Sequence, residues 1–228
     1  MLNVEKLSFS YGGVQALFEV SMRVPAGEMV CIMGRNGVGK TTLVRNIMGL
    51  LSFSFGSVAL DEVDISALPP HRRVGLGMAY VPQGRQIFPR LTVEENLRTG
   101  LPTKKAQIPA EVFEYFPVLD EMRHRMGGDL SGGQQQQLAI GRALVTKPKL
   151  LILDEPTEGI QPNIIQRIGE VLNSLSKEQG MTILIVEQYL DFVKEFCDRF
   201  VLMNRGRVVA ADEIAALSGE LIEEFLHV

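Results

Sequence analysis

Short runs of consecutive apolar residues recur along this chain, and each is followed by a glycine-rich, polar or helical segment. The four clearest runs have the length of buried strands. They cover residues 29–33, 78–81, 149–153 and 181–186. Helical periodicity is found at residues 43–48, 162–177 and 189–196. Strands that alternate with helices in this way are typical of an α/β domain, so we expect that fold class.

The two ends of the chain show a different pattern, in which apolar and polar residues alternate loosely. Residues 2–9 and 17–24 are separated by a Tyr-Gly-Gly sequence, and they predict a β-hairpin or a pair of edge strands. Near the other end, residues 200–203 and 208–210 flank a turn and predict a second hairpin. The acidic, leucine-containing stretch 212–226 predicts a terminal helix.

The stretch between residues 84 and 147 has mainly helical character. Thr92-Val-Glu-Glu95 fits a capping box, in which a threonine hydroxyl and a glutamate carboxylate each accept a backbone N–H at a helix start. Residues 134–147 predict the clearest helix of this stretch, and Pro148 prevents it from continuing. The polar, proline-containing stretch 101–110 predicts a surface loop.

Composition narrows the class of protein without identifying a function. The 228 residues are 46% hydrophobic and 22% charged, which is ordinary for a globular protein. A formal charge of −4 gives no electrostatic reason to expect a nucleic-acid partner. Cys31 and Cys197 stand in apolar surroundings, so we expect reduced core residues rather than a disulfide or a metal site.

The strongest chemical signal is Gly34-Arg-Asn-Gly-Val-Gly-Lys-Thr-Thr42, which fits the phosphate-binding pattern GxxxxGK[ST]. It lies between a predicted strand and a predicted helix, as that motif requires. Its glycines allow backbone N–H groups to surround a phosphate, and the helix start adds a positive dipole end. Lys40 would provide a cation for the β- and γ-phosphates, and the Thr41 hydroxyl is suited to hold Mg²⁺. A glycine-rich turn that merely caps a helix is the alternative.

A second signal follows the strand at residues 149–153, where the chain continues as Asp154-Glu155-Pro156. Acids at the carboxyl end of a buried strand lie where α/β sheets bind their ligands. Asp154 is suited to hold Mg²⁺, directly or through water. Glu155 is suited to take a proton from a water that attacks the γ-phosphate. An acidic turn before a proline is the alternative, and the phosphate-binding motif makes the catalytic interpretation the stronger one.

Two further segments have both a structural and a functional explanation. Leu130-Ser-Gly-Gly-Gln134 fits a capping box between Ser131 and Gln134, but an exposed helix start with glycine amides is also an anion site. Tyr11 could stack on a purine ring, although an ordinary turn aromatic is the simpler explanation from this residue alone.

In this order along the chain, the phosphate-binding motif, Gln83, Leu-Ser-Gly-Gly-Gln and Leu-Leu-Ile-Leu-Asp-Glu-Pro-Thr resemble the ATP-binding subunits of ABC transporters. The resemblance covers essentially the whole chain. It implies a P-loop NTPase core with an antiparallel β subdomain and an inserted helical subdomain. Residues 1–228 would form a single ABC ATPase domain. Residues 1–83 and 148–228 would hold the nucleotide-binding core with the β subdomain, and residues 84–147 the helical subdomain.

The resemblance also implies a set of site residues. Catalysis would involve Glu155, Gln83, Gln188 and Lys40, and Mg²⁺ would be held by Thr41, Gln83 and Asp154. ATP would contact Tyr11, which stacks on adenine, and Gly34, Arg35, Asn36, Gly37, Val38, Gly39, Lys40, Thr41 and Thr42. Because such domains form head-to-tail dimers, the same ATP would also contact Ser131, Gly132, Gly133 and Gln134 of a partner chain.

Two positions depart from the pattern of most of the superfamily. Gln188 stands where a histidine after the last core strand usually senses the γ-phosphate. Its amide can donate a hydrogen bond but cannot move a proton, which leaves Glu155 as the sole candidate base. Gln161 replaces a widespread aspartate, which puts in doubt any contact across the dimer that needs this carboxylate. Both substitutions fit the branched-chain amino acid and urea group.

Within the superfamily, the chain is most similar to the ATP-binding subunits of branched-chain amino acid and urea importers. The similarity is carried by residues 80–85, 87–88, 91–97, 157–162 and 186–188. The combination of Gly-Gly-Asp-Leu-Ser-Gly-Gly-Gln-Gln-Gln-Gln with Glu-Gly-Ile-Gln-Pro is closer to the urea-type subunit. The expected function is ATP hydrolysis that powers an importer of urea, short amides or branched-chain amino acids.

Such a function requires partners, because no apolar run approaches the ~18 residues of a membrane-spanning helix. We expect transmembrane permease subunits, a second ABC ATPase subunit that is the same chain or a related one, and indirectly a periplasmic solute-binding protein. Ile87, Phe88 and Leu91 are candidates for the permease contact, unless they are core residues. With no signal peptide at the first residues, the expected location is peripheral, at the cytoplasmic face of the inner membrane.

Three alternatives remain open at this point. A soluble assembly ATPase, such as one in iron–sulfur cluster construction, would bind soluble partners in place of a permease. An ABC exporter is the second, because lipopolysaccharide-exporting ATPases also resemble this group. A nucleic-acid ATPase is disfavoured, since those usually carry a coiled-coil insertion or a second fused ATPase domain, and the sequence shows neither.

Overall fold

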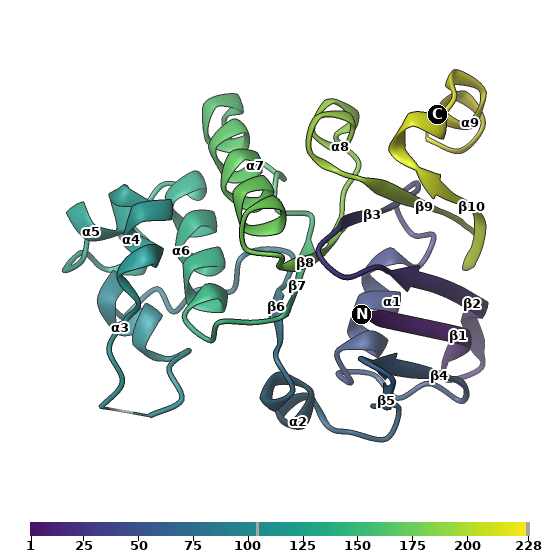
Figure 1. The fold of residues 1–228 in the computed structure, drawn as a ribbon, viewed down its shortest axis with the longest axis horizontal. Coiled ribbons are helices and arrows are strands. Elements are labelled where there is room, and N and C mark those ends of the chain that lie inside the picture. The colour runs from purple at the N-terminus through teal and green to yellow at the C-terminus, as the bar shows by residue number, and fades with distance from the viewer. Residues whose placement is uncertain (104, 227–228) are drawn as a thin grey trace.

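Two sheets form the framework of the computed structural model, which describes residues 1–103 and 105–226 (Figure 1). Among these residues, the larger sheet has the strand order β10-β9-β3-β8-β7-β6 and the smaller one the order β2-β1-β4-β5. The larger sheet contains β3 (Met29–Met33), β6 (Met78–Val81), β7 (Leu150–Asp154), β8 (Thr182–Val186), β9 (Arg199–Asn204) and β10 (Arg207–Glu213). The smaller contains β1 (Leu2–Tyr11), β2 (Val14–Val24), β4 (Phe55–Leu60) and β5 (Val63–Asp64).

Helices surround the larger sheet and form a group of their own at one end of the molecule. Figure 1 shows α3 to α6 at the left, far from the smaller sheet at the right. The helices are α1 (Lys40–Ile47), α2 (Pro70–Gly75), α3 (Val93–Arg98), α4 (Ala110–Tyr115), α5 (Pro117–Glu121), α6 (Gly132–Leu144), α7 (Pro162–Lys177), α8 (Leu190–Phe196) and α9 (Gly219–Phe225). In the part of the chain that the structure describes, no helix is long and apolar enough to span a membrane.

The central strands β3, β7 and β8 of the larger sheet are buried on both faces, which explains why they are almost wholly apolar. Strand β3 pairs in parallel with β8 and β9, and β7 pairs in parallel with β8 and β6. Met29, Cys31 and Met33 pack with α6, α7 and α8, whereas Val30 and Ile32 pack with α1 and the smaller sheet. Alternate residues of each strand therefore belong to two separate cores, as parallel sheets covered on both sides require.

The strands predicted from apolar runs are confirmed, and so is the α/β fold class. The first two strands form a true antiparallel hairpin, in which β1 lies between β2 and β4 and is not an edge strand. Cys31 and Cys197 are free and buried, as expected. The predicted loop at residues 101–110 has no helix or strand before α4 begins at Ala110, and residue 104 lies outside the described part.

Two predicted helices were placed incorrectly. The helix expected over residues 134–147 runs from Gly132 to Leu144, because the Ser131 capping box starts it early. It ends early because Lys147 adopts a left-handed φ of 51°. The predicted helix over 212–226 begins only at Gly219, since Asp212 and Glu213 still pair with β9 as the last residues of β10. Acidic residues suited an exposed edge strand as well as a helix.

The buried Arg73 joins α2 to the end of α1. Its side chain donates hydrogen bonds to the carbonyl oxygens of Asn46 and Ile47 at 2.9 and 2.6 Å, and to those of Ser66 and Leu68 at 3.0 and 2.8 Å. Burial lowers the pKa of this guanidinium. A cation that satisfies the last carbonyls of a helix is favoured by the helix dipole, so Arg73 fixes the end of the helix that follows the phosphate-binding motif.

Candidate active site

The loop between β3 and α1 carries the phosphate-binding motif and bends sharply at its glycines. Gly34 has a φ of 144° and Gly39 a φ of 107°, values that residues with a side chain rarely adopt. Space also requires glycine there. A Cβ on Gly34 would lie 2.4 Å from the Met203 carbonyl oxygen, and one on Gly39 would lie 2.9 Å from Leu17 Cδ2. The loop is therefore packed tightly between β2 and β9.

The side chain of Lys40 turns back into this loop. Its Nζ donates hydrogen bonds to the carbonyl oxygens of Gly34 at 2.7 Å and Arg35 at 3.0 Å. Burial lowers the pKa of Lys40, and attraction to the Glu155 and Asp154 carboxylates opposes this shift. A phosphate in the loop would replace two neutral carbonyl contacts with stronger contacts to charged oxygen atoms.

The Asp154 carboxylate lies at the end of β7 and is almost completely buried, with 1% of the residue exposed. The Thr41 hydroxyl donates to its Oδ1 at 3.1 Å, and the Tyr80 hydroxyl donates to its Oδ2 at 3.1 Å. Burial raises the pKa of Asp154, whereas these two hydrogen bonds lower it. A hydroxyl beside a carboxylate is a donor set that Mg²⁺ prefers, so Thr41 and Asp154 fit the predicted ion.

Glu155 follows directly, and two glutamine side chains hold its carboxylate. Gln83 Nε2 donates to Oε2 at 2.8 Å, and Gln188 Nε2 donates to Oε1 at 3.0 Å. The same Gln188 nitrogen donates to Asn36 Oδ1 at 2.7 Å, which connects the carboxylate to the loop. The backbone N–H of Glu155 donates to the Val186 carbonyl oxygen at 2.9 Å. The structure thus brings three other predicted site residues, Gln83, Gln188 and Asn36, together around one acid.

An open pocket of about 590 Å³ lies over the loop. Its lining includes Tyr11, Phe18, Asn36, Gly37, Gly39, Lys40, Thr41, Thr42, Gln83 and Glu155. The Tyr11 hydroxyl is 3.3 Å from Thr42 Oγ1, and its ring packs edge-on against Phe9 with centroids 4.7 Å apart. Tyr11 is 48% exposed, so one face of an aromatic ring is available beside the loop. Gly34, Arg35 and Val38 contribute through their backbones, outside the lining itself.

The segment Ser131 to Gln134 does not reach this pocket. It forms the start of α6, where the Ser131 hydroxyl accepts from Gln134 N–H at 3.3 Å and Gln134 Oε1 accepts from Ser131 N–H at 2.9 Å. The Arg85 guanidinium lies against Gly132 and donates to the Glu158 carbonyl oxygen at 3.1 Å. The predicted capping box is confirmed, and Ser131 remains exposed beside it.

Glu187 is a buried carboxylate that the sequence did not single out. Its Oε1 accepts from the Thr157 backbone N–H at 3.0 Å and from the Thr157 hydroxyl at 2.6 Å. Its Oε2 accepts from the backbone N–H groups of Gln188 and Tyr189 at 2.8 and 3.1 Å. Glu187 therefore fixes the chain on both sides of the site. An acid that follows an apolar strand, as Asp154 does, was the available signal.

The turn between β9 and β10 is a second contribution that was missed. Arg205 and Gly206 line the pocket. Gly206 N–H donates to the Val38 carbonyl oxygen at 2.9 Å, and Phe18 N–H donates to the Gly206 carbonyl oxygen at 2.9 Å. These bonds join the turn to both the loop and β2. Nothing in a short hairpin turn at the far end of the sequence indicated this position.

Comparison with known proteins agrees with this geometry. A family model described as "ABC transporter" matches residues 17–158. The high-affinity branched-chain amino acid transport ATP-binding protein BraG of Pseudomonas aeruginosa is 43% identical over 95% of this chain and 94% of its own length. The probable branched-chain amino acid transport ATP-binding protein LivF of Archaeoglobus fulgidus is 38% identical over 91% of this chain and 90% of its own length. The lipopolysaccharide export system ATP-binding protein LptB of Haemophilus influenzae is 34% identical over 92% of this chain and 89% of its own length.

Solved structures resemble the fold over nearly the whole chain. The ADP conformation of MJ1267, an ATP-binding cassette of an ABC transporter, has a TM-score of 0.87 at 30% identity and covers 98% of this chain and 97% of its own. A dimeric post-hydrolysis state of the ATP-binding cassette MJ0796, bound to ADP and phosphate, has a TM-score of 0.85 at 26% identity. It covers 94% of this chain and 99% of its own.

The substitution Glu187→Gln tests the role of the buried carboxylate. One of the two oxygens becomes an NH₂ group, which then faces backbone N–H donors that it cannot satisfy. We expect the free energy of unfolding, measured by urea denaturation, to fall by about 2–3 kcal/mol. Glu195→Gln is the control, because Glu195 is exposed and accepts from Gln166 at 2.8 Å. Equal stability losses in the two variants would contradict the role given to Glu187.

Proposed function

The chain belongs to the ABC transporter family, and from this premise we propose that it is the subunit that powers a membrane importer. As an ATP-binding cassette it binds and hydrolyses ATP. One observation carries the assignment of the site: Lys40 and Thr41 of the loop line one pocket with Glu155, and Thr41 donates to Asp154 at the end of β7.

The triphosphate of ATP binds in the loop. Lys40 gives up its hydrogen bonds to the carbonyl oxygens of Gly34 and Arg35 and contacts the β- and γ-phosphates instead. Tyr11 stacks on the adenine from its exposed position at the edge of the pocket. Thr41 and Asp154, together with Gln83, would hold Mg²⁺, which supplies positive charge to the phosphate oxygens. The Thr41 oxygen has lone pairs that could face the ion while its O–H still donates to Asp154 Oδ1.

Glu155 is the proposed base for the water that attacks the γ-phosphate. A carboxylate has about four lone-pair sites, and the amides of Gln83 and Gln188 occupy two of them. The remaining sites can orient the water and accept its proton. Because Gln188 also donates to Asn36, the carboxylate keeps a fixed position relative to the loop, which is the geometric requirement for this step.

A second molecule completes the site in this proposal. The exposed start of α6, Ser131 to Gln134, offers a hydroxyl and glycine amides but lies outside its own pocket. These groups would contact the γ-phosphate held by a partner chain, so that ATP joins two subunits and hydrolysis releases them. The dimeric cassette among the structural neighbours supports this arrangement. The partner is a second copy of this chain or a related ATPase.

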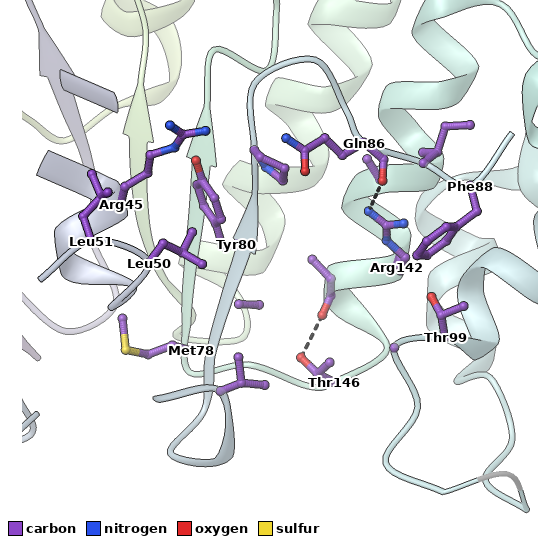
Figure 2. A pocket seen from close by; sticks show the side chains of 17 residues that line it. Arg45, Leu50, Leu51, Met78, Tyr80, Gln86, Phe88, Thr99, Arg142 and Thr146 are labelled. Carbon is purple, nitrogen blue, oxygen red and sulfur yellow. Dashed lines mark hydrogen bonds between the residues drawn. The ribbon is translucent and has the colours of Figure 1, made fainter. Parts of the chain in front are cut away.

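A groove of about 910 Å³ on another face supports a permease contact (Figure 2). Leu50, Leu51 and Phe88 give it apolar walls, and Arg45 and Arg142 give it positive charge. Arg142 lies over the Phe88 ring at 5.2 Å and donates to the Gln86 carbonyl oxygen at 2.8 Å, which holds both side chains in place. A cytoplasmic segment of a transmembrane subunit with apolar and acidic side chains fits this lining.

Of the three predicted permease contacts, two lie at this groove. Phe88 is 48% exposed and Ile87 joins the lining while also packing on the core. Leu91 lies outside it. We further propose the division into a core of residues 1–83 and 148–228 and a helical subdomain of residues 84–147, with the groove between them. Its occupant would hold the chain peripherally at the cytoplasmic face of the membrane.

Branched-chain amino acids are the proposed cargo, because two relatives named for that transport align with over nine-tenths of the chain. Urea or a short amide is the second candidate, supported by the strings Gly127 to Gln137 and Glu158 to Pro162. Export of lipopolysaccharide is the third candidate, supported by the similarity to LptB, a protein named for that transport.

The substitution Glu155→Gln tests the catalytic proposal. We expect phosphate release to slow by about 10²- to 10⁴-fold, because the general base is lost, while binding of a fluorescent ATP analogue is retained. The variant should also elute as a dimer with ATP in size-exclusion chromatography. Glu158→Gln is a matched control, since Glu158 also accepts from Gln83, at 3.2 Å. Rapid phosphate release by Glu155→Gln would exclude Glu155 as the base.

The substitution Phe88→Asp tests the docking groove. A carboxylate in the apolar wall should prevent co-purification with two multi-span membrane proteins from detergent extracts, while the ATPase activity of the isolated chain persists. Phe55→Asp is the control, because Phe55 is 58% exposed on β4 and lies outside the groove. Undiminished assembly of Phe88→Asp would refute the groove as the contact. Recovery of the native chain only in a soluble complex would favour an assembly ATPase.

The cargo can be identified with the complete transporter in lipid nanodiscs. We expect its ATPase rate to rise with leucine-loaded solute-binding protein, because a loaded binding protein favours the closed ATPase dimer in an importer. Urea-loaded binding protein is the matched comparison. Stimulation by urea alone would establish the second candidate. Stimulation by lipopolysaccharide, without any binding protein, would replace import by export.

A further inference from the structure

Tyr80 faces two sites that the chain keeps apart. Its ring forms part of the floor of the groove, and Figure 2 shows it between Leu50 and Arg45. The hydroxyl at the end of the same ring donates to Asp154 Oδ2 at 3.1 Å. Asp154 does not line the groove. A single half-buried side chain therefore connects the surface proposed for docking to the carboxylate proposed for Mg²⁺.

The hydrogen bond from Tyr80 has a specific place in the site. Asp154 accepts from the Thr41 hydroxyl on Oδ1 and from the Tyr80 hydroxyl on Oδ2. The Thr41 oxygen could ligate the ion through a lone pair while its O–H still donates, so Tyr80 and Thr41 would each hold one oxygen and together fix the rotation of the carboxylate. Neighbours of this kind set the direction of a metal ligand, and their loss typically weakens metal binding by roughly 10- to 100-fold.

We propose that Tyr80 is a positioning residue that orients Asp154 for Mg²⁺ and transmits the occupancy of the groove to that carboxylate. The proposal rests on the proposed function, which assigns the ion to Asp154 and the permease to the groove. A phenol ring is rigid, so a segment that presses on its groove face displaces the hydroxyl by a similar distance. Hydrogen bonds weaken steeply when their angle falls, which makes the carboxylate sensitive to small displacements.

The surroundings of Tyr80 make this connection direct. Tyr80 of β6 pairs with Ile152 of the neighbouring strand β7. Ile152 is two residues before Asp154, so this pairing holds the Tyr80 backbone close to the carboxylate. The Arg45 guanidinium lies beside the Tyr80 hydroxyl in Figure 2 and also lines the groove. An acidic group on the docked segment would draw Arg45 toward the groove and change the charge next to the Tyr80 hydroxyl. Contact and charge thus act on the same oxygen atom.

The first experiment uses the isolated full chain and Tyr80→Phe, which keeps the ring but removes the hydroxyl. Mn²⁺ is titrated by electron paramagnetic resonance in the presence of a non-hydrolysable ATP analogue. We expect Mn²⁺ to bind about tenfold more weakly, and the Mg²⁺ concentration that gives half-maximal ATPase activity to rise in parallel. Metal-free binding of the analogue should be unchanged. Unaltered Mn²⁺ affinity would overturn the proposal.

The control is Tyr115→Phe, which also removes a tyrosine hydroxyl. Tyr115 accepts a hydrogen bond from Gln179 at a surface distant from the loop and lies outside both the groove and the nucleotide pocket. Its Mn²⁺ affinity should equal that of the native chain. Urea denaturation of both variants separates a local effect from lost stability. An equal loss of Mn²⁺ affinity in the two variants would show a general effect of stability and overturn the proposal.

The second experiment tests transmission in the assembled transporter at saturating Mg²⁺. Tyr80→Phe should still co-purify with the membrane subunits, but their stimulation of its ATPase should fall toward the rate of the chain alone. Full stimulation would overturn the transmission step. Failure of the docking proposal would show itself differently, because Phe88→Asp would then still assemble with the membrane subunits. The Mn²⁺ titration uses the isolated chain and does not depend on docking.

Discussion

The parallel pairing of β3, β8 and β7 is the constraint on which the rest of the molecule depends. Ile32 pairs with Val186, and Val186 pairs with Asp154, so three strands end at one edge of the sheet. The segments that leave this edge are tied back to it, since Glu155 N–H donates to the Val186 carbonyl oxygen and Glu187 N–H donates to that of Ile32. Main-chain hydrogen bonds therefore assemble loop, acids and amides from distant parts of the sequence, as the carboxyl edges of α/β sheets generally do.

Most of the framework could be predicted because its signals are local. Strands buried on both faces must be apolar throughout, and the phosphate-binding loop needs glycines at fixed spacing. The same reasoning placed Asp154 and Glu155 at a strand end beside that loop, and the structure confirms their proximity to Thr41 and Gln83. The roles of these residues stay predictions, as does the division of the chain at residues 83 and 148.

What the sequence could not provide are contacts that depend on which strands are neighbours. Tyr80 meets Asp154 only because β6 lies beside β7. Arg205 lines the pocket only because its hairpin turn is bonded to the loop and β2. Arg73 is buried only because backbone carbonyls of two segments surround its guanidinium. The ends of helices and strands were predicted incorrectly where the residues suit both a helix and a strand. The acidic residues that extend β10 are an example.

The position of α3 to α6 between β6 and β7 has a consequence for how such chains diversify. Met78 pairs with Leu150 and Val81 with Leu153, so the chain leaves the sheet and re-enters it on adjacent strands. The entropy of closing a loop between fixed ends grows only slowly with its length. Insertions, deletions or a wholesale exchange of this segment thus leave the strand ladder intact. The surface of α3 to α5 could therefore be refitted to a new partner within one contiguous stretch, as long as Ser131 to Gln134 at the start of α6, the proposed contact to ATP, are kept.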